Sequence, residues 1–453
     1  MTRFTTPQLQ QKRNRGRRLA VEMLENRRVL ATMSVTNLND AGEGSLREAI
    51  EIANANPGED TIEFDDSLGG GTIQLSSELL VSDNININPT SVDITISGTE
   101  ADPTPDVHDG QGIRLFHFTT IPVTPSFSPS RIQGLTLIGG DVTGSGGAIF
   151  SMHGIILTDV TVASNAATED GGGVFISSEE SSGFGLVRSV FEHNVAQGDG
   201  GAAKLINNRF GYAAVDNSEF RENQAVGSGG AIDIENYESF TLVSQSDFEF
   251  NEADIGGSMN VFTEGGQSQI ELTSVRSNVA NTMGGINSMT TNAGIMVAFD
   301  VEVIGNNGRF GNGGAQFAST NNGQSRIANS TFNENTTILE GGGLTLHASR
   351  NAIVTADNIT VQGNHSDYTG GGVRLLSFDG GNAGLTRSRV SGNSGLIGGG
   401  AEMLVGTDSY ASIFNSAIYD NSAQFDGGGI NIEASQNEAT AAIVNSTISG
   451  NSA

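Results

Sequence analysis

An asparagine that recurs at a nearly constant spacing is the feature that most limits what this chain can fold into. Eleven asparagines each follow an apolar residue by three positions, and their spacing ranges from 27 residues (251 to 278) to 30 residues (421 to 451). A fixed period of this length is typical of stacked supersecondary units, in which each unit covers the apolar face of its neighbour. The asparagines are Asn165, Asn194, Asn223, Asn251, Asn278, Asn306, Asn335, Asn364, Asn393, Asn421 and Asn451.

The residues around each asparagine favour short strands. The apolar residue three positions earlier is always Val, Ile or Phe, as at Phe220, and a second strand pattern follows the Gly-Gly pair of each repeat, as at 229–234. No helical period separates the two patterns, which excludes alternating strands and helices. We therefore expect an all-β fold, a right-handed parallel β-helix (solenoid) with one repeat of about 28–29 residues per coil. At a strand spacing of about 4.8 Å, its roughly 13–14 coils would span about 65 Å.

Stacked coils give the recurring residues structural roles. The asparagine amides can form a ladder that bonds the coils above and below, with a backbone that tolerates the left-handed conformation. The Gly-Gly pairs suit turns that need positive φ or close backbone approach. Five positions before the asparagine a Ser or Thr is common, and we expect it on the same strand face as the apolar residue. Six positions before, as at Asn217 and Asn329, we expect a residue of the opposite face.

Charge excludes several classes of partner. The formal net charge is −29, yet eight of the 22 basic residues and only two acidic residues lie in the first 31, so the remainder carries 14 basic against 49 acidic residues. Such a body is a poor partner for nucleic acid or anionic lipid, because both need Lys and Arg. The chain has no cysteine, and no stretch approaches the 18 or so apolar residues of a membrane-spanning helix.

Residues 1–33 form a basic segment without the apolar core of a secretory signal. Leu24-Glu25-Asn26-Arg27 and Val29-Leu30-Ala31 resemble the LEPR-XLL motif, with Asn26 where that family has Pro. The resemblance implies a sorting segment of a large bacterial surface or exported protein. The alternative is an ordinary short basic amphipathic helix.

Residues 34–70 have the pattern of a lid over the first coil. We expect a strand starting at Val35, a helix after a capping box of Ser45 and Glu48, and a second strand at 61–64. Ser45-Leu46-Arg47-Glu48-Ala49 resembles the CSLREA domain, with Gly44 in place of the Cys. In that family the segment precedes right-handed β-helices of surface proteins.

Residues 71–145 predict irregular first coils, with strands at 72–75, 92–96 and 132–137, and residues 146–453 hold the regular repeats. The Phe-x-x-Asn and Gly-Gly-Ala-Ile phrases resemble repeats of the chlamydial-type polymorphic outer-membrane proteins, which are adhesin-like surface passengers. The resemblance implies an extracellular location, at the bacterial cell surface or outer membrane. The next Gly-Gly pair is due directly after Ala453, so we expect more chain beyond it.

Parallel β-helices also host polysaccharide lyases and glycoside hydrolases, which use paired carboxylates or Ca²⁺ with a Lys or Arg base. One column, Lys204 above Asp233 and Asn260, offers such groups, with Glu219 and Asp247 on a neighbouring strand. The alternative for Lys204 and Asp233 is a solvated cross-strand pair. The six histidines fall at unrelated positions of the repeat and predict surface or turn residues rather than a metal site: His108, His117, His153, His193, His347 and His365.

Function is expected at one edge of the rod. Insertions of varying length fall between the two strands of a repeat, at 179–184, 207–212, 321–325 and 379–384, and coil stacking would align them. We expect this edge to bind a surface carbohydrate or a protein ligand. The chain is then a non-enzymatic, adhesin-like scaffold without a cofactor, although its acidity leaves Ca²⁺ open; the alternative is a carbohydrate-active enzyme of the β-helix class.

Overall fold

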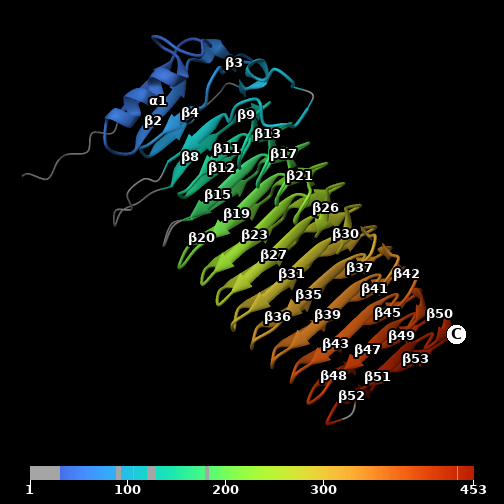
Figure 1. Ribbon diagram of the computed structural model, residues 1–453. Coiled ribbons are helices and arrows are strands. Elements are labelled where there is room, and N and C mark those ends of the chain that lie inside the picture. Colours follow the sequence, from blue (N-terminus) through green and yellow to red (C-terminus); the bar gives the residue numbers. More distant parts are fainter. Residues whose placement is uncertain (1–30, 88–92, 106, 120–128, 179–182, 436) are drawn as a thin grey trace, which may run out of the picture.

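The computed structural model describes residues 31–87, 93–105, 107–119, 129–178, 183–435 and 437–453 (Figure 1). These residues form a parallel β-solenoid of about 14 turns, which confirms the predicted fold class. Figure 1 shows a straight rod with the only described α-helix, α1, at one end and the C-terminus at the other. The LEPR-XLL-like residues 24–30 lie outside the described ranges, and the predicted domain boundaries stay predictions.

Each regular coil contributes one strand to each of four sheets. One such coil runs through β16 (Phe184–Val187), β17 (Val190–Glu192), β18 (Val195–Ala196) and β19 (Ala203–Asn207). We name the sheets by these strands in chain order: sheet A has 15 strands, sheet B 14, sheet D 11 and sheet C 13. The pattern continues to the last coil, formed by β50 (Ser422–Asp426), β51 (Ile430–Ala434), β52 (Thr440–Val444) and β53 (Thr447–Ser449).

A small lid covers the first coil. It consists of β1 (Thr32–Val35), α1 (Leu46–Ala55) and β2 (Asp60–Phe64). The Glu48 N–H donates to Ser45 Oγ (3.2 Å), as the predicted capping box requires. The Glu48 carboxylate, however, accepts the N–H of Gly44 (2.6 Å) instead of that of Ser45, which donates to the Gly42 carbonyl (3.1 Å). The helix buries its apolar face, made of Leu46, Ala49, Ile50 and Ala53. Val35 was predicted to start a strand, but it is the last residue of β1. The inward-facing residues of this strand are Met33 and Val35, which alternate with exposed residues.

The first coils are less regular than those that follow. Their strands are β3 (Thr72–Gln74), β4 (Leu79–Val81), β5 (Ile85–Ile87), β6 (Ile94–Ser97), β7 (Phe116–Phe118), β8 (Ser130–Gln133) and β9 (Leu135–Ile138). The single strand predicted over 132–137 is wrong. Gly134 adopts φ +65° and turns the chain there, so that β8 belongs to sheet A and β9 to sheet B.

The corners on either side of sheet B use the left-handed backbone region in each regular coil. Between sheets A and B it is occupied by the residue six before the asparagine, as at Asn217 (φ 50°) and Asn329 (φ 51°), so the prediction of an opposite-face strand position is wrong. The Ser that follows is buried in the same corner, where its hydroxyl accepts the N–H of the preceding coil's Ser, as from Ser189 to Ser218 at 3.1 Å. Between sheets B and D the left-handed residue directly precedes the asparagine, as at Glu222 (φ 53°). None of the eleven asparagines itself has positive φ.

The interior is a set of stacked side chains. The rings of Phe191, Phe220 and Phe248 are fully buried and lie 4.8 and 4.7 Å apart, with interplanar angles of 6° and 2°. Such offset stacks add to the stability that apolar burial already supplies. The Gly-Gly pairs permit this close stacking: Gly229 has φ +66°, and a Cβ on Gly230 would lie 2.2 Å from the carbonyl oxygen of Gly257 in the next coil.

The eleven asparagines lie in one continuous column beside this interior. The Asn306 side chain is representative: its Oδ1 accepts from the backbone N–H (2.9 Å) and Nδ2 (3.0 Å) of Asn278, and its Nδ2 donates to the carbonyl of Val275 (3.0 Å) and to Oδ1 of Asn335 (3.0 Å). The same contacts repeat from Asn165 to Asn451. Each amide therefore satisfies buried polar groups of the coils before and after it.

Removing one interior rung should destabilise the rod far more than removing the amide next to it. Asn306→Ala leaves buried donors and acceptors without partners, so we expect a loss of about 2–4 kcal/mol in the free energy of unfolding. Asn307 follows it in sequence and is exposed, so Asn307→Ala should cost under about 0.5 kcal/mol. Urea-unfolding midpoints measure both effects, and equal midpoints for the two variants would contradict the role of the ladder.

Candidate functional site

The predicted Lys204 column lies on the outer face of sheet C. Lys204 in β19 is paired in register with Asp233 in β23 (Ile232–Tyr237), which is paired with Asn260 in β27 (Met259–Glu264). The Lys204 Nζ lies 2.6 Å from Asp233 Oδ1, 2.7 Å from Glu235 Oε1 and 3.4 Å from Asp199 Oδ2. The Asn260 amide donates to the other Asp233 oxygen at 2.6 Å. Lys204 therefore faces three carboxylates.

These charges are buried, although they project from the outer face of the sheet. Lys204 is 3% and Asp233 1% exposed. Burial lowers the pKa of Lys204, but the carboxylates of Asp233 and Glu235 more than offset this and raise it above its ordinary value. Burial raises the pKa of Asp233 to about 6, although Lys204 and Asn260 act in the opposite direction. A rise is physically reasonable because one ammonium group is shared among several carboxylates.

Glu219 and Asp247 do not join this group. They are exposed and paired with each other in β21 (Glu219–Arg221) and β25 (Asp247–Glu249) of sheet B, which is separated from sheet C by sheet D. Arg221 lies 3.1 Å from Glu219. The four candidate catalytic residues are thus divided between two sheets. The alternative of a solvated Lys204–Asp233 pair is wrong, because the pair is buried.

The same column contains a second buried ion pair that the sequence analysis missed. Following the register from Asn260 leads through one residue per coil to Arg374 in β43 (Val373–Phe378) and Glu402 in β47 (Ala401–Val405). Arg374 Nε lies 2.6 Å from Glu402, and its Nη1 pairs with Glu340. The sequence contained the signal, because Arg374 and Glu402 stand at the same distance after the first glycine of their repeats as Lys204 and Asp233 do. The predicted column extended over three coils only and so did not reach them.

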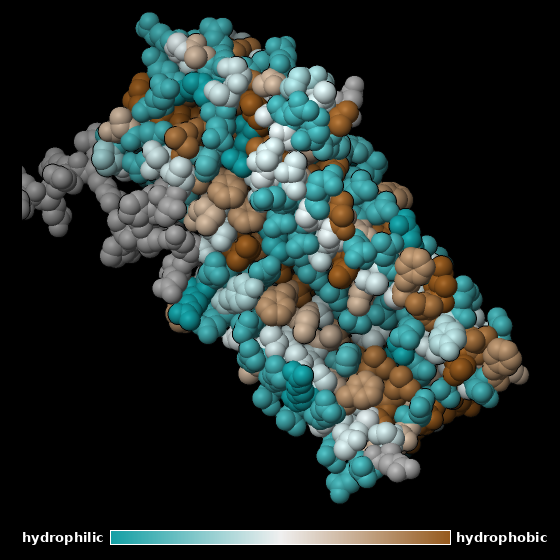
Figure 2. All heavy atoms as spheres, in the orientation of Figure 1, coloured by the Kyte–Doolittle hydropathy of each residue, from teal (hydrophilic) through white to brown (hydrophobic). Residues whose placement is uncertain are grey.

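An open cavity of about 540 Å³ lies next to this column. It is formed by β31 (Ile286–Thr291), β35 (Ala315–Ser319), β39 (Leu344–Ser349) and β43, together with the turns that lead to sheet A. Figure 2 shows apolar residues gathered over this face of the rod, bordered by hydrophilic ones. Its lining includes Met289, Gln316, Ala318, Thr320, His347, Ser349, Arg350, Phe378 and Asp379.

His347 is the titratable ring of this cavity. Its imidazole lies edge-on to the Phe378 ring, with centroids 5.9 Å apart and an interplanar angle of 85°. Burial, with a smaller contribution from the positive charge of Arg374, lowers the pKa of His347. The ring is therefore neutral at pH 7 and offers one hydrogen-bond donor and one acceptor.

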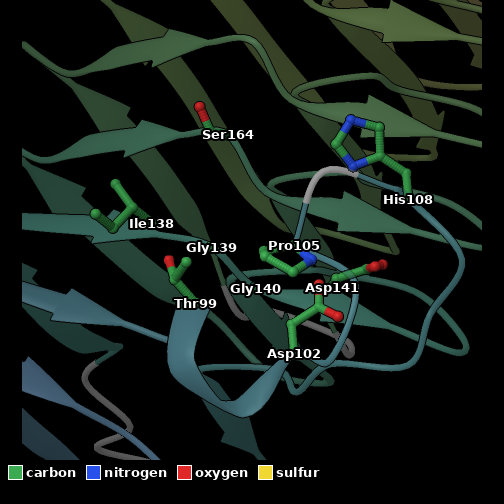
Figure 3. A pocket seen from close by; sticks show the side chains of 9 residues that line it. All are labelled: Thr99, Asp102, Pro105, His108, Ile138, Gly139, Gly140, Asp141 and Ser164. Carbon is green, nitrogen blue, oxygen red and sulfur yellow. The ribbon is translucent and has the colours of Figure 1, made fainter.

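A second cavity, of about 300 Å³, lies beside the irregular first coils (Figure 3). Asp102, Asp109 and Asp141 each place a carboxylate oxygen within 4.8 Å of the others, and Figure 3 shows Asp102 and Asp141 next to each other at the cavity. Asp141 accepts the N–H groups of Gly110 (3.0 Å) and Asp109 (3.2 Å). Burial, together with the charge of Asp102, raises the pKa of Asp141 even though these N–H groups act against it.

These three carboxylates are the described residues that could hold a hard cation, since Ca²⁺ prefers clustered oxygen ligands. The sequence analysis missed them because they come from irregular segments where the repeat gives no register. Ca²⁺ as a cofactor stays a prediction.

The histidines form no metal-binding cluster within the described part of the chain. His153 lies in the turn between β11 (Ile149–Ser151) and β12 (Ile155–Thr158), but it is 2% exposed and so is no surface residue. Its ring nitrogens lie 3.2 Å from the Thr119 carbonyl and 3.4 Å from Ser130 Oγ. Burial lowers the pKa of His153 to about 4, so it is a neutral polar residue of the interior.

Comparisons with known proteins leave the family open. No protein-family model matches the sequence, and no curated protein matches it. Among solved structures, the A-module of the mannuronan C-5 epimerase AlgE6 of Azotobacter vinelandii is similar, with a TM-score of 0.34 and 11% identity over 90% of this chain and 96% of that one. At that TM-score the likeness carries no functional argument. Within the described ranges, no helix has the length and apolar character needed to cross a bilayer.

The Asp233 carboxylate should make stability depend on pH in a way that Asp233→Asn removes. Its pKa of about 6 in the folded state lies above the ordinary 3.8, so the folded protein binds this proton more tightly than the unfolded chain does. As the pH falls from 7 to 4, the free energy of unfolding of the wild type should rise relative to that of the variant, by at most about 3 kcal/mol. Urea-unfolding midpoints of both proteins across this range provide the measurement. A difference that does not change with pH would contradict the buried carboxylate.

Proposed function

We propose that this chain is a non-enzymatic, adhesin-like scaffold that is displayed outside the cell and binds a ligand along one edge of the solenoid. The observation that carries the proposal is the burial of Lys204 and Asp233, which are 3% and 1% exposed. A catalytic acid or base must come within hydrogen-bonding distance of the substrate. Here the polar atoms of both side chains already contact Glu235, Asp199 and Asn260.

The edge between sheets C and A supports a binding role. Its described turns vary in length, from two residues (238 and 239) to four (320–323), while the coil does not. The described turns at 208–211, 320–323 and 379–381 follow one another along this edge, whereas residues 179–182 of the first predicted insertion lie outside the described ranges. The larger cavity is lined in part by residues from turns of this edge, namely Thr320, Arg350 and Asp379. Variation confined to surface turns on a constant scaffold is typical of ligand-binding repeat proteins.

Display outside the cell rests on the sequence resemblances. The LEPR-XLL-like segment, the CSLREA-like lid and the polymorphic outer-membrane-protein-like repeats all imply surface or exported proteins. The acidic, cysteine-free body agrees with such a location without requiring it.

Brief protease treatment of intact cells should degrade the solenoid of the full-length product while leaving a cytosolic marker intact. Immunoblotting with an antibody against the repeats measures this, and lysed cells provide the control for cleavability. Protection of the repeats in intact cells, together with cleavage after lysis, would contradict surface display.

The purified chain should release or modify no polysaccharide. Neutral and uronate oligosaccharides incubated with the protein, with and without added Ca²⁺, should be recovered unchanged by mass spectrometry and proton NMR. Product formation that Lys204→Met and Asp233→Asn both abolish, in variants that still fold, would overturn the non-enzymatic assignment.

A further inference from the structure

We propose that the 540 Å³ cavity on sheet C is a binding site for a neutral oligosaccharide, which lies along the cavity from Met289 at one end to Phe378 at the other. The inference rests on the proposed scaffold function and names its ligand class. A volume of this size lies within the range of about 300–1,000 Å³ that is usual for small-molecule sites.

The hollow arises from one small side chain in an outward-facing column. Met289, Ala318 and His347 are paired in register in consecutive coils. The Ala318 side chain is smaller than those of Met289 and His347, so a hollow is left over Ala318 on the outer face of the sheet. Phe378 lies two coils beyond Ala318, at the end of β43 and beside the His347 ring. The cavity therefore spans four strands, or about 14 Å at the spacing of a sheet, which is longer than a single sugar ring.

The lining has the mixed character that a sugar ring requires. Phe378 and Met289 present apolar surfaces, and Met289 is 44% exposed without a covering partner. The flat C–H face of a pyranose can stack on such surfaces. Gln316, Thr320 and Ser349 supply neutral donors and acceptors at the border of the cavity for hydroxyl groups.

The charges around the cavity favour a neutral ligand over an acidic one. Arg350 and Asp379 contribute one charge of each sign at the exposed border. Arg374, the next cation along the sheet, is already paired with Glu340 and Glu402. The chain as a whole carries a formal charge of −29, which repels polyuronates and other polyanions before they reach the surface. His347 is neutral at pH 7, because burial lowers its pKa, and so presents hydrogen bonds rather than charge.

Isothermal titration calorimetry of the purified chain against linear glucose, mannose and galactose oligosaccharides tests the proposal, with oligouronates of equal length as the charged comparison. At least one neutral series should bind in preference to the uronates. Phe378→Ala should weaken that binding by about tenfold, since truncation of an aromatic residue that anchors a ligand usually costs over 1 kcal/mol. Phe310→Ala is the matched control, because Phe310 is an exposed ring (57%) that does not line the cavity.

Ala318→Phe provides a second test that removes no contact. The larger side chain fills the hollow from the outer face of the sheet, so it should abolish binding while the unfolding midpoint stays close to that of the wild type. This variant also decides the matter if Phe378→Ala fails to fold.

The failures of this inference and of the scaffold proposal can be told apart. If the folded wild type binds no neutral oligosaccharide, or binds uronates more tightly, the ligand assignment is overturned and surface display is untouched. If binding survives both Phe378→Ala and Ala318→Phe, the location is wrong. If the oligosaccharide is cleaved or modified during the titration, the scaffold proposal fails while the site assignment stands.

Discussion

The hydrogen bonds that each coil makes to the next are the constraint on which the rest of this structure depends. A parallel strand leaves half of its backbone groups for each neighbour, and no strand of the rod is stable alone. The asparagine ladder extends this dependence to the corners, where strand pairing is interrupted. Each amide accepts the backbone N–H of the preceding asparagine and donates to the side-chain oxygen of the next one, as Asn306 does between Asn278 and Asn335. The corner is thereby hydrogen-bonded from coil to coil, as the sheets are.

This constraint separates what the chain must keep from what it can vary. Inward side chains must match those of the coils above and below, as the stacked rings of Phe191, Phe220 and Phe248 do. Outward side chains need only be compatible with a β-strand. The outward column that begins at Lys204 therefore contains Lys, Asp, Asn, Gln, Thr, Arg and Glu at equivalent positions of successive coils. A hollow can form wherever one member is small, as at Ala318, without disturbing the interior. Such a rod can present different surfaces to solvent on one invariant support.

The repeat made most of the fold predictable. The spacing of the asparagines predicts the length of a coil and the parallel stacking of its strands. It also predicts the column that contains Lys204 and Asp233, because stacked coils place equivalent residues in register. The corner residues were misassigned because a left-handed Asn or Asp, as at Asn217, has the same alternation in sequence as an extended one. The site was harder to predict. Burial of Lys204 depends on Glu235 and Asp199, and the Asp102 cluster lies in coils without a repeat, so no pattern in the chain indicated either.

The central claim, that coil lies upon coil in register, can be measured as a distance. Glu219 and Arg389 are exposed, 170 residues apart in sequence, and lie six strands apart in one column of sheet B. Because the chain has no cysteine, spin labels on Glu219→Cys and Arg389→Cys are specific. Double electron–electron resonance should give one narrow distance near 29 Å, six times the strand spacing of about 4.8 Å. A broad distribution, or a distance far from this value, would contradict the stacked solenoid.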